Sequence, residues 1–399
     1  MGAGPAGLLL GALLQRHGVA AVILEARSRD YVEARIRAGV LEQGTVDVLR
    51  EAGAADRLDR EGLRHGGIYL CFDGVHHHIP MSELTGGRAV TVYGQTEVVK
   101  DLIAARVTGG AELHFECAEV SVHGLEGDAP SVRYTRDGQE HELRCDYIAG
   151  CDGFHGVCRP SIPEGVITTW TREYPFAWLG ILADVAPSTD ELIYAYHDRG
   201  FALHSMRSPT ISRLYVQVDR NADIADWSDA RIWDELHVRL ASDGWELTEG
   251  PVLEKSITAM RSFVAAPLRH GALLLAGDAA HIVPPTGAKG LNLAASDVAV
   301  LAEALVARVT EGSATGLDEY SDRCLERIWR AQHFSWFMTT MLHTDPGDDG
   351  YGRQLQKSQL RYVTSSAAAM TSLSENYVGL PLEATVPARV PAAPGAARP

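Results

Sequence analysis

Apolar and polar positions alternate with two different periods along the chain, and the change of period predicts where helices give way to strands. Residues 5–17 have the 3.6-residue apolar spacing of a helix, which Gly18 ends. An apolar run over 20–24, closed by Glu25, predicts a short buried strand. The two form the second half of a β–α–β unit whose first strand has no counterpart, because the chain begins at Met1. This gap leads us to expect a misplaced start codon or a truncated chain.

The remaining pattern predicts a mixed α/β fold with two or three domains. Helices are predicted over 35–55, 96–107 and 227–241, and a mainly helical region over 291–373. Strands are predicted over 66–72, 112–122, 131–136, 142–149 and 272–278. Four further strands, at 176–184, 191–196, 201–206 and 211–218, predict a separate and mostly antiparallel β domain. The Pro/Ala-rich tail, 386–399, is predicted to be disordered.

Composition and charge exclude several classes of partner. A formal net charge of -16 argues against binding to a nucleic-acid backbone, which needs a basic face. No run reaches the roughly 18 apolar residues of a membrane span. The six cysteines form no C-x-x-C pair, so we expect reduced thiols, no metal, and a cytoplasmic protein. The run His76–His78 is interpreted as a polar strand edge, since adjacent residues on a strand point to opposite faces.

The glycines at the N-terminus have the spacing of a dinucleotide-binding turn. Gly2 permits a tight turn, Gly4 lets the backbone approach a pyrophosphate, and Gly7 lets the helix pack closely. The following helix offers free N–H groups and a partial positive charge to the phosphates. Glu25 ends the next strand, where a carboxylate is expected to bind ribose hydroxyls. The turn alone does not choose between FAD and a nicotinamide dinucleotide.

Two further segments run from a strand into an aspartate. These are 146–153, which contains Asp152-Gly153, and 273–281, which contains Gly277-Asp278. Singly, each aspartate is explained as a turn former or a helix N-cap. Together with the N-terminal turn they resemble the signature of single-component flavoprotein hydroxylases. Five runs make the resemblance specific to the 4-hydroxybenzoate 3-monooxygenase family, over residues 1 to about 382: 35–44, 91–98, 145–156, 277–298 and 375–381.

The resemblance implies a domain organisation and a reaction. The implied fold is a Rossmann-like FAD-binding domain lacking its first strand, a β-rich substrate domain and a helical C-terminal part. The implied boundaries are 1–172 and 265–340 for the FAD-binding domain, 173–264 for the substrate domain, 341–385 for a helical interface region and 386–399 for the tail. The implied reaction is hydroxylation of 4-hydroxybenzoate to 3,4-dihydroxybenzoate with O₂ and NADPH or NADH, through a C4a-hydroperoxyflavin. The family is also homodimeric.

The resemblance assigns cofactor-binding residues one by one. Those for FAD are Gly2, Gly4, Gly7, Glu25, Arg35, Arg37, Gln95, Asp278, Gly287, Gly290, Leu291 and Asn292. Those tied to the nicotinamide are Arg37, His155 and Arg261, while Arg213 matches a residue that touches the flavin in its mobile position. The chain has no second glycine-rich fingerprint, so the nicotinamide is expected to dock transiently without a Rossmann domain of its own.

Substrate-binding residues follow from the chemistry of a hydroxybenzoate and from the resemblance. Arg207 is expected to pair with the carboxylate, and Ser205 and Tyr215 to complete its cage. Alone, Arg207 would be interpreted as a surface charge.

At the phenol end the resemblance assigns Tyr194, with Tyr377 and His65 as a proton relay and Pro285 as a backbone carbonyl facing the substrate. Alone, either tyrosine would be interpreted as a core residue.

Three alternatives remain open from the sequence. The substrate is either 4-hydroxybenzoate or a substituted relative, because residues such as His204, Met206 and Tyr196 give the pocket its own character. A second alternative is a degenerate homologue without catalytic activity, because the first strand of the FAD-binding domain is missing. For the coenzyme, Arg27 and Arg29 favour the 2′-phosphate of NADPH whereas Asp30 and Glu33 oppose it, and we expect at least partial use of NADH.

Overall fold

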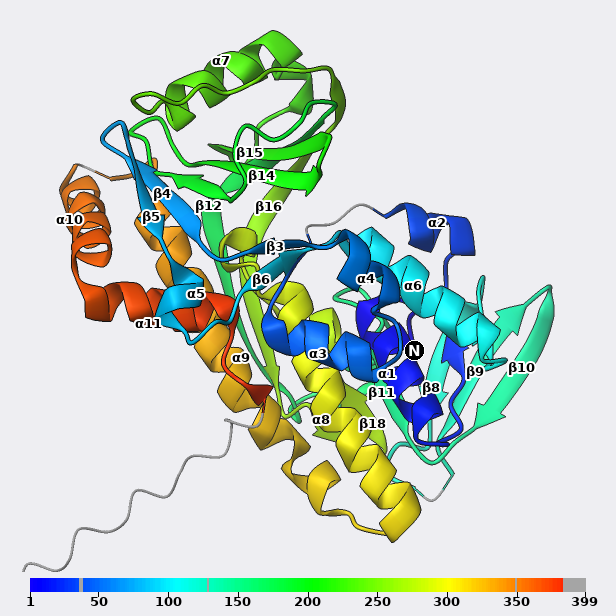
Figure 1. The fold of residues 1–399 in the computed structure, drawn as a ribbon. Coiled ribbons are helices and arrows are strands. Elements are labelled where there is room, and N and C mark those ends of the chain that lie inside the picture. Colours follow the sequence, from blue (N-terminus) through cyan, green and yellow to red (C-terminus); the bar gives the residue numbers. More distant parts are fainter. Residues whose placement is uncertain (36–38, 128, 349, 383–399) are drawn as a thin grey trace, which may run out of the picture.

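The chain folds into a mixed α/β architecture, as the sequence predicts, with two regions joined by a pair of long strands (Figure 1). The structure is a computed structural model that describes residues 1–35, 39–127, 129–348 and 350–382. The region at the bottom of Figure 1 contains the N-terminus and the helices α1 (Pro5–Arg16), α3 (Gln43–Glu51), α6 (Gln95–Thr108) and α8 (Gly290–Glu311). The region at the top contains a large sheet with helix α7 (Asp229–Leu240) on its outer face.

Among the described residues the large sheet has eight strands, in the order β19-β16-β12-β15-β14-β13-β4-β5. All neighbours are antiparallel except β13 and β4. The bounds are β4 (Ile68–Phe72), β5 (Val75–Ile79), β12 (Thr168–Ala183), β13 (Ile193–Ala195), β14 (Ala202–Ser208), β15 (Ile211–Asp219), β16 (Val252–Ala266) and β19 (His281–Ile282). The sheet therefore recruits strands from before and after the predicted β-rich segment, and this pairing satisfies backbone groups that sheet edges would otherwise expose.

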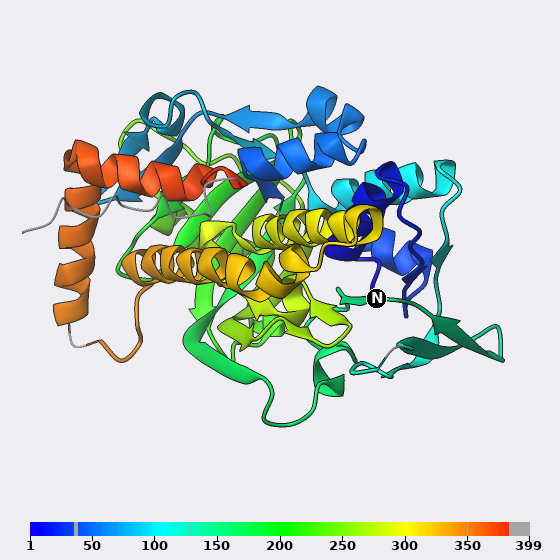
Figure 2. The same cartoon turned by 90° about the horizontal axis from the view of Figure 1, so that it is seen from below.

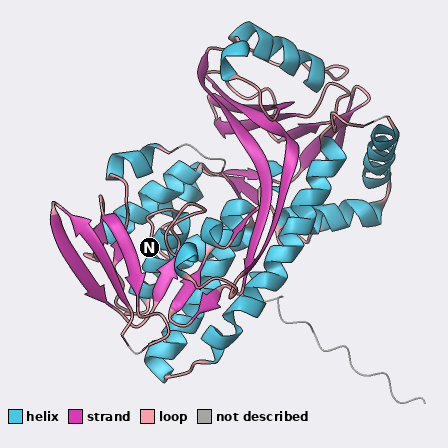
Figure 3. Ribbon diagram, turned by 180° about the vertical axis from the view of Figure 1, so that it is seen from behind, coloured by secondary structure: helices cyan, strands magenta, loops and turns pink. Residues whose placement is uncertain are grey.

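Strands β12 and β16 connect the two regions. They are 16 and 15 residues long and pair from Thr168↔Ala266 to Ala183↔Val252, with a register shift after Glu173. Seen from behind, these strands run out of the large sheet and down into the lower region (Figure 3). The strand predicted over 176–184 is therefore shorter than β12, because a strand long enough to cross both regions is buried differently in each.

The lower region has two short parallel pairs on either side of the N-terminus. One pair is β1 (Ile23–Leu24) with β7 (Leu113–His114); the other is β11 (Ile148–Gly150) with β18 (Leu273–Leu275), and β17 (Arg269–His270) lies beside β18. The first two residues link the pairs: the Met1 amino group donates to Ala149 O at 2.8 Å, and Gly2 N donates to Leu24 O at 2.7 Å. The predicted strand over 20–24 is shorter than expected, since only two of its residues have a paired neighbour.

The predicted helix over 35–55 is wrong for much of its length. Residues 36–38 lie outside the described part, and β2 (Val40–Leu41) pairs with β6 (Val90–Val92) before α3 begins. A tertiary pairing therefore overrides the local helical pattern at 40–41. The other short elements are α2 (Arg29–Ala34), α4 (Asp56–Glu61), β3 (Leu63–His65), α5 (Met81–Leu84), β8 (Ala118–His123), β9 (Ser131–Arg136) and β10 (Gln139–Arg144).

The C-terminal part is helical, as predicted, with α9 (Thr315–Leu342), α10 (Tyr351–Ser365) and α11 (Ala367–Val378) following α8. Helices α8 and α9 run side by side beneath the molecule (Figure 2). By length and composition α8 passes the test for a membrane span, but 67% of its most apolar window is buried and it packs on α1, α3 and α9. It is a core helix. The predicted disordered tail, 386–399, lies outside the described residues.

Apolar packing divides the molecule into three clusters. The first fills the lower region around α1, α6 and α8. The second lies between the large sheet and helices α9–α11, and the third between the sheet and α7. All six cysteines are free thiols, and five of them are buried, in agreement with the sequence.

Candidate active site

The N-terminal glycine turn has the geometry that close backbone packing requires. Gly2 has φ +92°, a backbone conformation that is strained for residues other than glycine. A Cβ on Gly7 would lie 2.0 Å from the carbonyl oxygen of Gly2. At Gly4, by contrast, a Cβ would meet nothing within 4 Å. Helix α1 begins directly after Gly4 and has no side-chain cap, so its first amides are available to an anion.

Two carboxylates lie directly after β1 and β18, strands of the two parallel pairs that the first residues of the chain link. Glu25 follows β1, and its oxygens accept hydrogen bonds from Ala3 N at 2.7 Å and Arg27 N at 2.8 Å. Asp278 follows β18 and is exposed, within the short 3₁₀ turn Gly277–Ala279. Gly277 lies against α1, because a Cβ there would be 3.3 Å from the Cβ of Ala6. The glycine turn and the exposed carboxylate of Asp278 therefore share one edge of the lower region.

Asp152, the other strand-end aspartate, acts within the protein. Its Oδ2 accepts a hydrogen bond from Cys158 N at 2.9 Å, and its buried Oδ1 has no partner among the described residues. A carboxylate oxygen so placed has room for one more donor.

The loop from Pro284 to Lys289 leads from β19, in the large sheet, to α8 in the lower region. It contains the 3₁₀ turn Pro285–Gly287 and then Ala288, whose φ of +53° is unusual for a residue with a side chain. Gly290 opens α8 with nothing within 4 Å of a Cβ, and Leu291 beside it is half-buried. As at α1, the helix has no side-chain cap, so its N-terminal amides are available to a ligand.

Asn292 holds this loop in place with four hydrogen bonds. Its Oδ1 accepts from Glu42 N at 2.9 Å and Thr45 Oγ1 at 2.7 Å, and its Nδ2 donates to Val40 O at 3.0 Å and Ala288 O at 2.6 Å. The predicted cofactor residue thus joins the loop to β2 and α3.

Two further predicted cofactor residues, Arg35 and Gln95, lie at the start of α6. Gln95 is the first residue of α6, and the carbonyl of the exposed Arg35 accepts a hydrogen bond from Thr96 Oγ1 at 3.1 Å. Arg37 lies outside the described residues.

The structure brings five predicted substrate residues into one pocket under the large sheet. They are Tyr194, Ser205, Arg207, Tyr215 and Pro285. Other residues of the lining are mainly apolar: Val40, Val92, Trp178, Leu192, Leu203 and Met206. A pocket with an apolar wall and a few converging polar groups suits a small aromatic acid.

Burial shapes the chemistry at Arg207. Its guanidinium packs against the backbone of Gly94, because a Cβ built on Gly94 would lie 2.2 Å from the Cζ of Arg207. Burial lowers the pKa of Arg207 from its ordinary value, but an arginine remains charged at neutral pH. The register of β14 against β15 shifts between Met206 and Ser208, which is why both Met206 and Arg207 line the pocket. Strict alternation along a strand would place only one of these two adjacent residues in the pocket.

A hydrogen-bonded tyrosine pair closes the pocket. The hydroxyls of Tyr194, on β13, and Tyr377, on α11, are 2.6 Å apart and both side chains are buried. Burial raises the pKa of Tyr194 and of Tyr377, so both phenols stay protonated at neutral pH and pass a proton only as part of a chain.

His65 ends β3 and is buried. Its Nδ1 has no partner among the described residues, and burial lowers its pKa, so the neutral ring can accept a proton.

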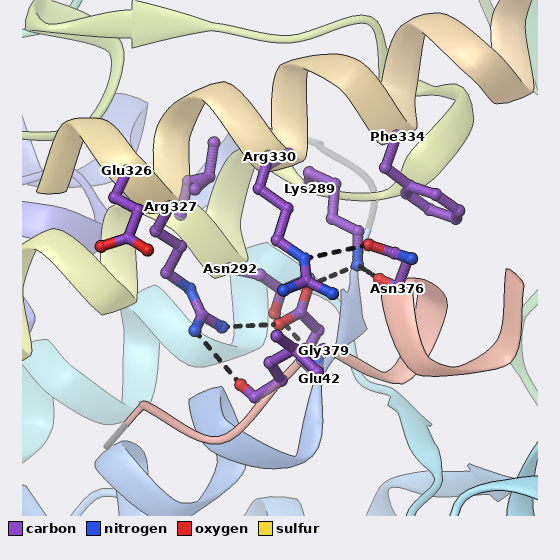
Figure 4. A pocket seen from close by; sticks show the side chains of 12 residues that line it. Glu42, Lys289, Asn292, Glu326, Arg327, Arg330, Phe334, Asn376 and Gly379 are labelled. Carbon is purple, nitrogen blue, oxygen red and sulfur yellow. Dashed lines mark hydrogen bonds and ion pairs between the residues drawn. The ribbon is translucent and has the colours of Figure 1, made fainter. Parts of the chain in front are cut away.

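A second pocket, beside the loop, contains charged residues that the sequence did not single out (Figure 4). Lys289 Nζ donates to Glu42 Oε1 at 2.5 Å and to the carbonyls of Asn376 and Tyr377. Arg327 contacts the other oxygen of Glu42 at 3.2 Å. Both Lys289 and Glu42 are buried, and burial lowers the pKa of Lys289. The cluster ties the loop to the helix that positions Tyr377.

Two of the three residues predicted for the nicotinamide, Arg261 and His155, lie around one aromatic ring, and the third, Arg37, is outside the described residues. The guanidinium of Arg261 lies 4.1 Å from the ring centroid of Phe154, and the ring of the exposed His155 lies 5.0 Å from it at 87°. Arg159 also lies over Phe154, at 4.7 Å. The sequence did not identify Phe154 or Arg159, although both lie in or next to the run 145–156.

The chain is similar to known flavoproteins in sequence and in fold. A family described as FAD binding domain matches residues 1–335. The chain is 52% identical over 384 residues to a p-hydroxybenzoate hydroxylase of Acinetobacter baylyi, covering 96% of this chain and 95% of that protein. It is 26% identical to a kynurenine 3-monooxygenase of Salinispora tropica, covering 79% and 73%. The solved structure of a p-nitrophenol 4-monooxygenase from Pseudomonas putida, 20% identical, superposes with a TM-score of 0.81 over 95% of this chain and 97% of that one, which shows a shared fold.

The open space at Gly4 gives a direct test of the cofactor site. We expect Gly4→Ala to keep the thermal stability of the parent, because its φ of -74° suits alanine and its Cβ meets no atom. We expect FAD affinity to fall by about tenfold or more, because a methyl group would keep the pyrophosphate from the backbone. Fluorescence titration of the apoprotein with FAD measures this. Unchanged affinity would place the pyrophosphate elsewhere.

Proposed function

Since this chain belongs to the p-hydroxybenzoate hydroxylase family of proteins with an FAD binding domain, we propose that it hydroxylates 4-hydroxybenzoate to 3,4-dihydroxybenzoate, with O₂ and a reduced nicotinamide. The observation that carries the proposal is the pocket that combines Arg207, Ser205 and Tyr215 with the Tyr194–Tyr377 pair. A substrate with a carboxylate and a phenol matches this set of groups. The 52% identity over nearly the whole chain supports the same substrate.

The described residues fit FAD. Two uncapped helix N-termini, at α1 and α8, each begin beside a glycine with open space, Gly4 and Gly290. The first suits a pyrophosphate, and the second suits the electron-rich edge of a flavin ring. Glu25 and Asp278 offer carboxylate oxygens to ribose and ribityl hydroxyls. Gly287, Leu291 and Asn292 would hold the ring side of the group, with Arg35 and Gln95, at the start of α6, as further contacts. Arg37, outside the described residues, is assigned to FAD from the resemblance alone.

The protein's own part in the reaction is binding, positioning and proton transfer. The chemistry that FAD supplies when bound is reduction by the nicotinamide and activation of O₂ for transfer of one oxygen atom. Arg207 would pair bidentately with the substrate carboxylate, with Ser205 and Tyr215 as further donors. The apolar wall would exclude water from the ring, and the carbonyl of Pro285 would face the substrate oxygen.

Proton transfer would start at Tyr194. The Tyr194 hydroxyl would accept the phenol proton while it donates its own proton to Tyr377. His65 would take up the proton at the outer end of this chain. Loss of the phenol proton makes the ring carbon next to it more nucleophilic. Support comes from the short contact between the tyrosines and from the neutral, buried ring of His65.

The nicotinamide would dock at the surface around Phe154, with His155, Arg261 and Arg37 as its contacts. The grouping of two cationic side chains over one ring favours a flat ligand that carries phosphates. NADH is expected to serve at least partly, because Arg29 is paired with Glu33 at 2.6 Å, which partly neutralises it toward a 2′-phosphate.

We further propose a cytoplasmic homodimer formed through α10. This helix presents Tyr351, Leu355 and Tyr362 on its outer face, each more than half exposed. Large exposed apolar side chains on one helix face are typical of an interface.

The activity itself is tested with the purified chain. We expect a flavin absorbance spectrum, oxidation of NADH and NADPH that 4-hydroxybenzoate stimulates, and formation of 3,4-dihydroxybenzoate measured by chromatography. A panel of substituted 4-hydroxybenzoates identifies a related substrate if it is turned over faster. Bound FAD without hydroxylation of any of these acids would argue against the proposed function.

Arg207 is expected to recognise the substrate carboxylate. Arg207→Lys should raise the KM for 4-hydroxybenzoate by about 10- to 100-fold, the usual effect of losing a charge-assisted hydrogen bond, because lysine cannot form the bidentate pair. FAD affinity should not change. In a binding assay, 4-hydroxybenzamide should bind the two proteins equally, since it lacks the carboxylate. An equal loss for both ligands would mean that Arg207 acts on the shape of the pocket instead.

The tyrosine pair is expected to transfer a proton. Tyr377→Phe should lower kcat by about 10- to 100-fold and leave KM nearly unchanged, because the hydroxyl bonds Tyr194 rather than the substrate. Tyr134→Phe removes another tyrosine hydroxyl far from the pocket and serves as the control. Steady-state kinetics measure both. An increase in KM with constant kcat would contradict the relay.

The dimer is tested by sedimentation. The variant Leu355→Glu should shift the chain from dimer to monomer, because an ionised carboxylate in an apolar interface costs more than the contact returns. Val309→Glu, at an exposed apolar position on α8, should leave the dimer intact. A monomeric parent protein would contradict the proposal.

A further inference from the structure

We propose that Asp297 and His281 form a buried pair that positions the FAD-holding turn Gly277–Ala279, and through it the carboxylate of Asp278. Neither side chain faces the substrate pocket, and the first residue of the pair lies in the middle of α8. The inference rests on FAD binding and is independent of which aromatic acid the protein hydroxylates.

Asp297 accepts hydrogen bonds from both sides of Asp278. Asp297 Oδ2 accepts a hydrogen bond from Gly277 N at 2.9 Å and from His281 Nε2 at 2.6 Å. The two donors stand immediately before and shortly after Asp278, so one oxygen atom fixes the backbone on both sides of it. Gly277 has φ +62°, and a Cβ there would approach α1 and α8 to 3.3–3.4 Å, which leaves the turn little freedom to move.

Asp278 depends on this support for its direction. The residue is exposed, and among the described residues no hydrogen bond holds its carboxylate. Its orientation toward a ligand is therefore set by the backbone of the turn rather than by contacts of its own side chain. A residue that fixes this backbone acts on FAD through Asp278, without touching FAD.

Charge makes the pair stronger than an ordinary hydrogen bond. Both side chains are buried, at 1% exposure each. Burial disfavours a charged imidazole, but the carboxylate of Asp297, and to a lesser degree that of Asp278, outweigh it and raise the pKa of His281. The hydrogen bond between His281 Nε2 and the carboxylate of Asp297 is therefore charge-assisted, which makes it shorter and stronger than one between two neutral groups.

The pair also links the turn to the large sheet. His281 begins β19, which pairs with β16 at Val264↔His281. Strand β16 is one of the two that join the regions, so the position of the FAD-holding turn is coupled to the strand that reaches the substrate region. A buried ion pair contributes little net stability compared with apolar residues, which favours a positioning role for this one.

The test compares FAD affinity with stability. Asp297→Asn keeps the size of the side chain but removes its charge. Tyr320→Phe is the matched control: it removes the buried hydrogen bond to Leu275 O at 2.8 Å, on the strand before the turn, and among the described residues this hydroxyl makes no hydrogen bond to residues 277–281. Both variants are made as the full chain, FAD is removed, and its rebinding is followed by fluorescence, with thermal unfolding measured on the apoprotein.

We expect Asp297→Asn to raise the dissociation constant for FAD by about 10- to 100-fold, the range for a lost charge-assisted hydrogen bond. Tyr320→Phe should lower the unfolding temperature comparably yet leave the FAD dissociation constant within about threefold of the parent. An Asp297→Asn variant that binds FAD within threefold of the parent would overturn the proposal. So would an equal loss of affinity in Tyr320→Phe.

A second pair of variants keeps the proposal testable if Asp297→Asn fails to fold. His281→Gln retains an N–H donor for Asp297, whereas His281→Ala does not. We expect the glutamine variant to bind FAD about tenfold more tightly than the alanine variant. Equal affinities would show that the hydrogen bond to Asp297 does not position the turn.

Discussion

The parallel pairing of β11 with β18 is the constraint on which the cofactor side of the structure depends. It joins segments more than a hundred residues apart, at Ile148↔Leu273 and Gly150↔Leu275, and brings their carboxyl ends to one edge. Cys151 N, directly after β11, donates to the carbonyl of Met1, so the glycine turn is fastened to the same edge. Ligands of open α/β sheets bind at such an edge, because helix N-termini and strand-end side chains converge there. Without this pairing, Asp278 and Gly4 would have no common site.

Buried charge connects that edge to the substrate pocket. Lys289 lies directly before α8, and its ammonium group donates hydrogen bonds to Glu42, the residue before α3, and to carbonyls in the last turn of α11. A buried lysine and glutamate cost free energy unless their hydrogen bonds are satisfied. Here Arg327 and three backbone or side-chain acceptors satisfy them. Hydrogen bonds therefore tie the loop before α8 to the end of α11, which carries Tyr377.

The large sheet shows how tertiary pairing changes an assignment made from local pattern. The alternation over 201–206 and 211–218 identified β14 and β15 because their alternate apolar residues are buried, those of β15 in the third cluster and those of β14 in both the second and the third. The same approach could not assign β4 and β5 to this sheet, since nothing in their own residues indicates a partner more than a hundred positions away. It also failed at 40–41, where pairing with β6 outweighs a helical spacing.

The sequence by itself predicted the glycine turn, the strand-end carboxylates, the mixed α/β class and five residues that line one pocket, because each depends on a local motif or on close resemblance along the whole chain. Only the tertiary structure decided which groups meet: the Tyr194–Tyr377 contact, the packing of Arg207 on Gly94, the Lys289–Glu42–Arg327 cluster and the grip of Asp297 on Gly277. Contacts of this kind join residues far apart in the chain. Their distances depend on how whole strands and helices pack, and no local pattern of residues contains that information.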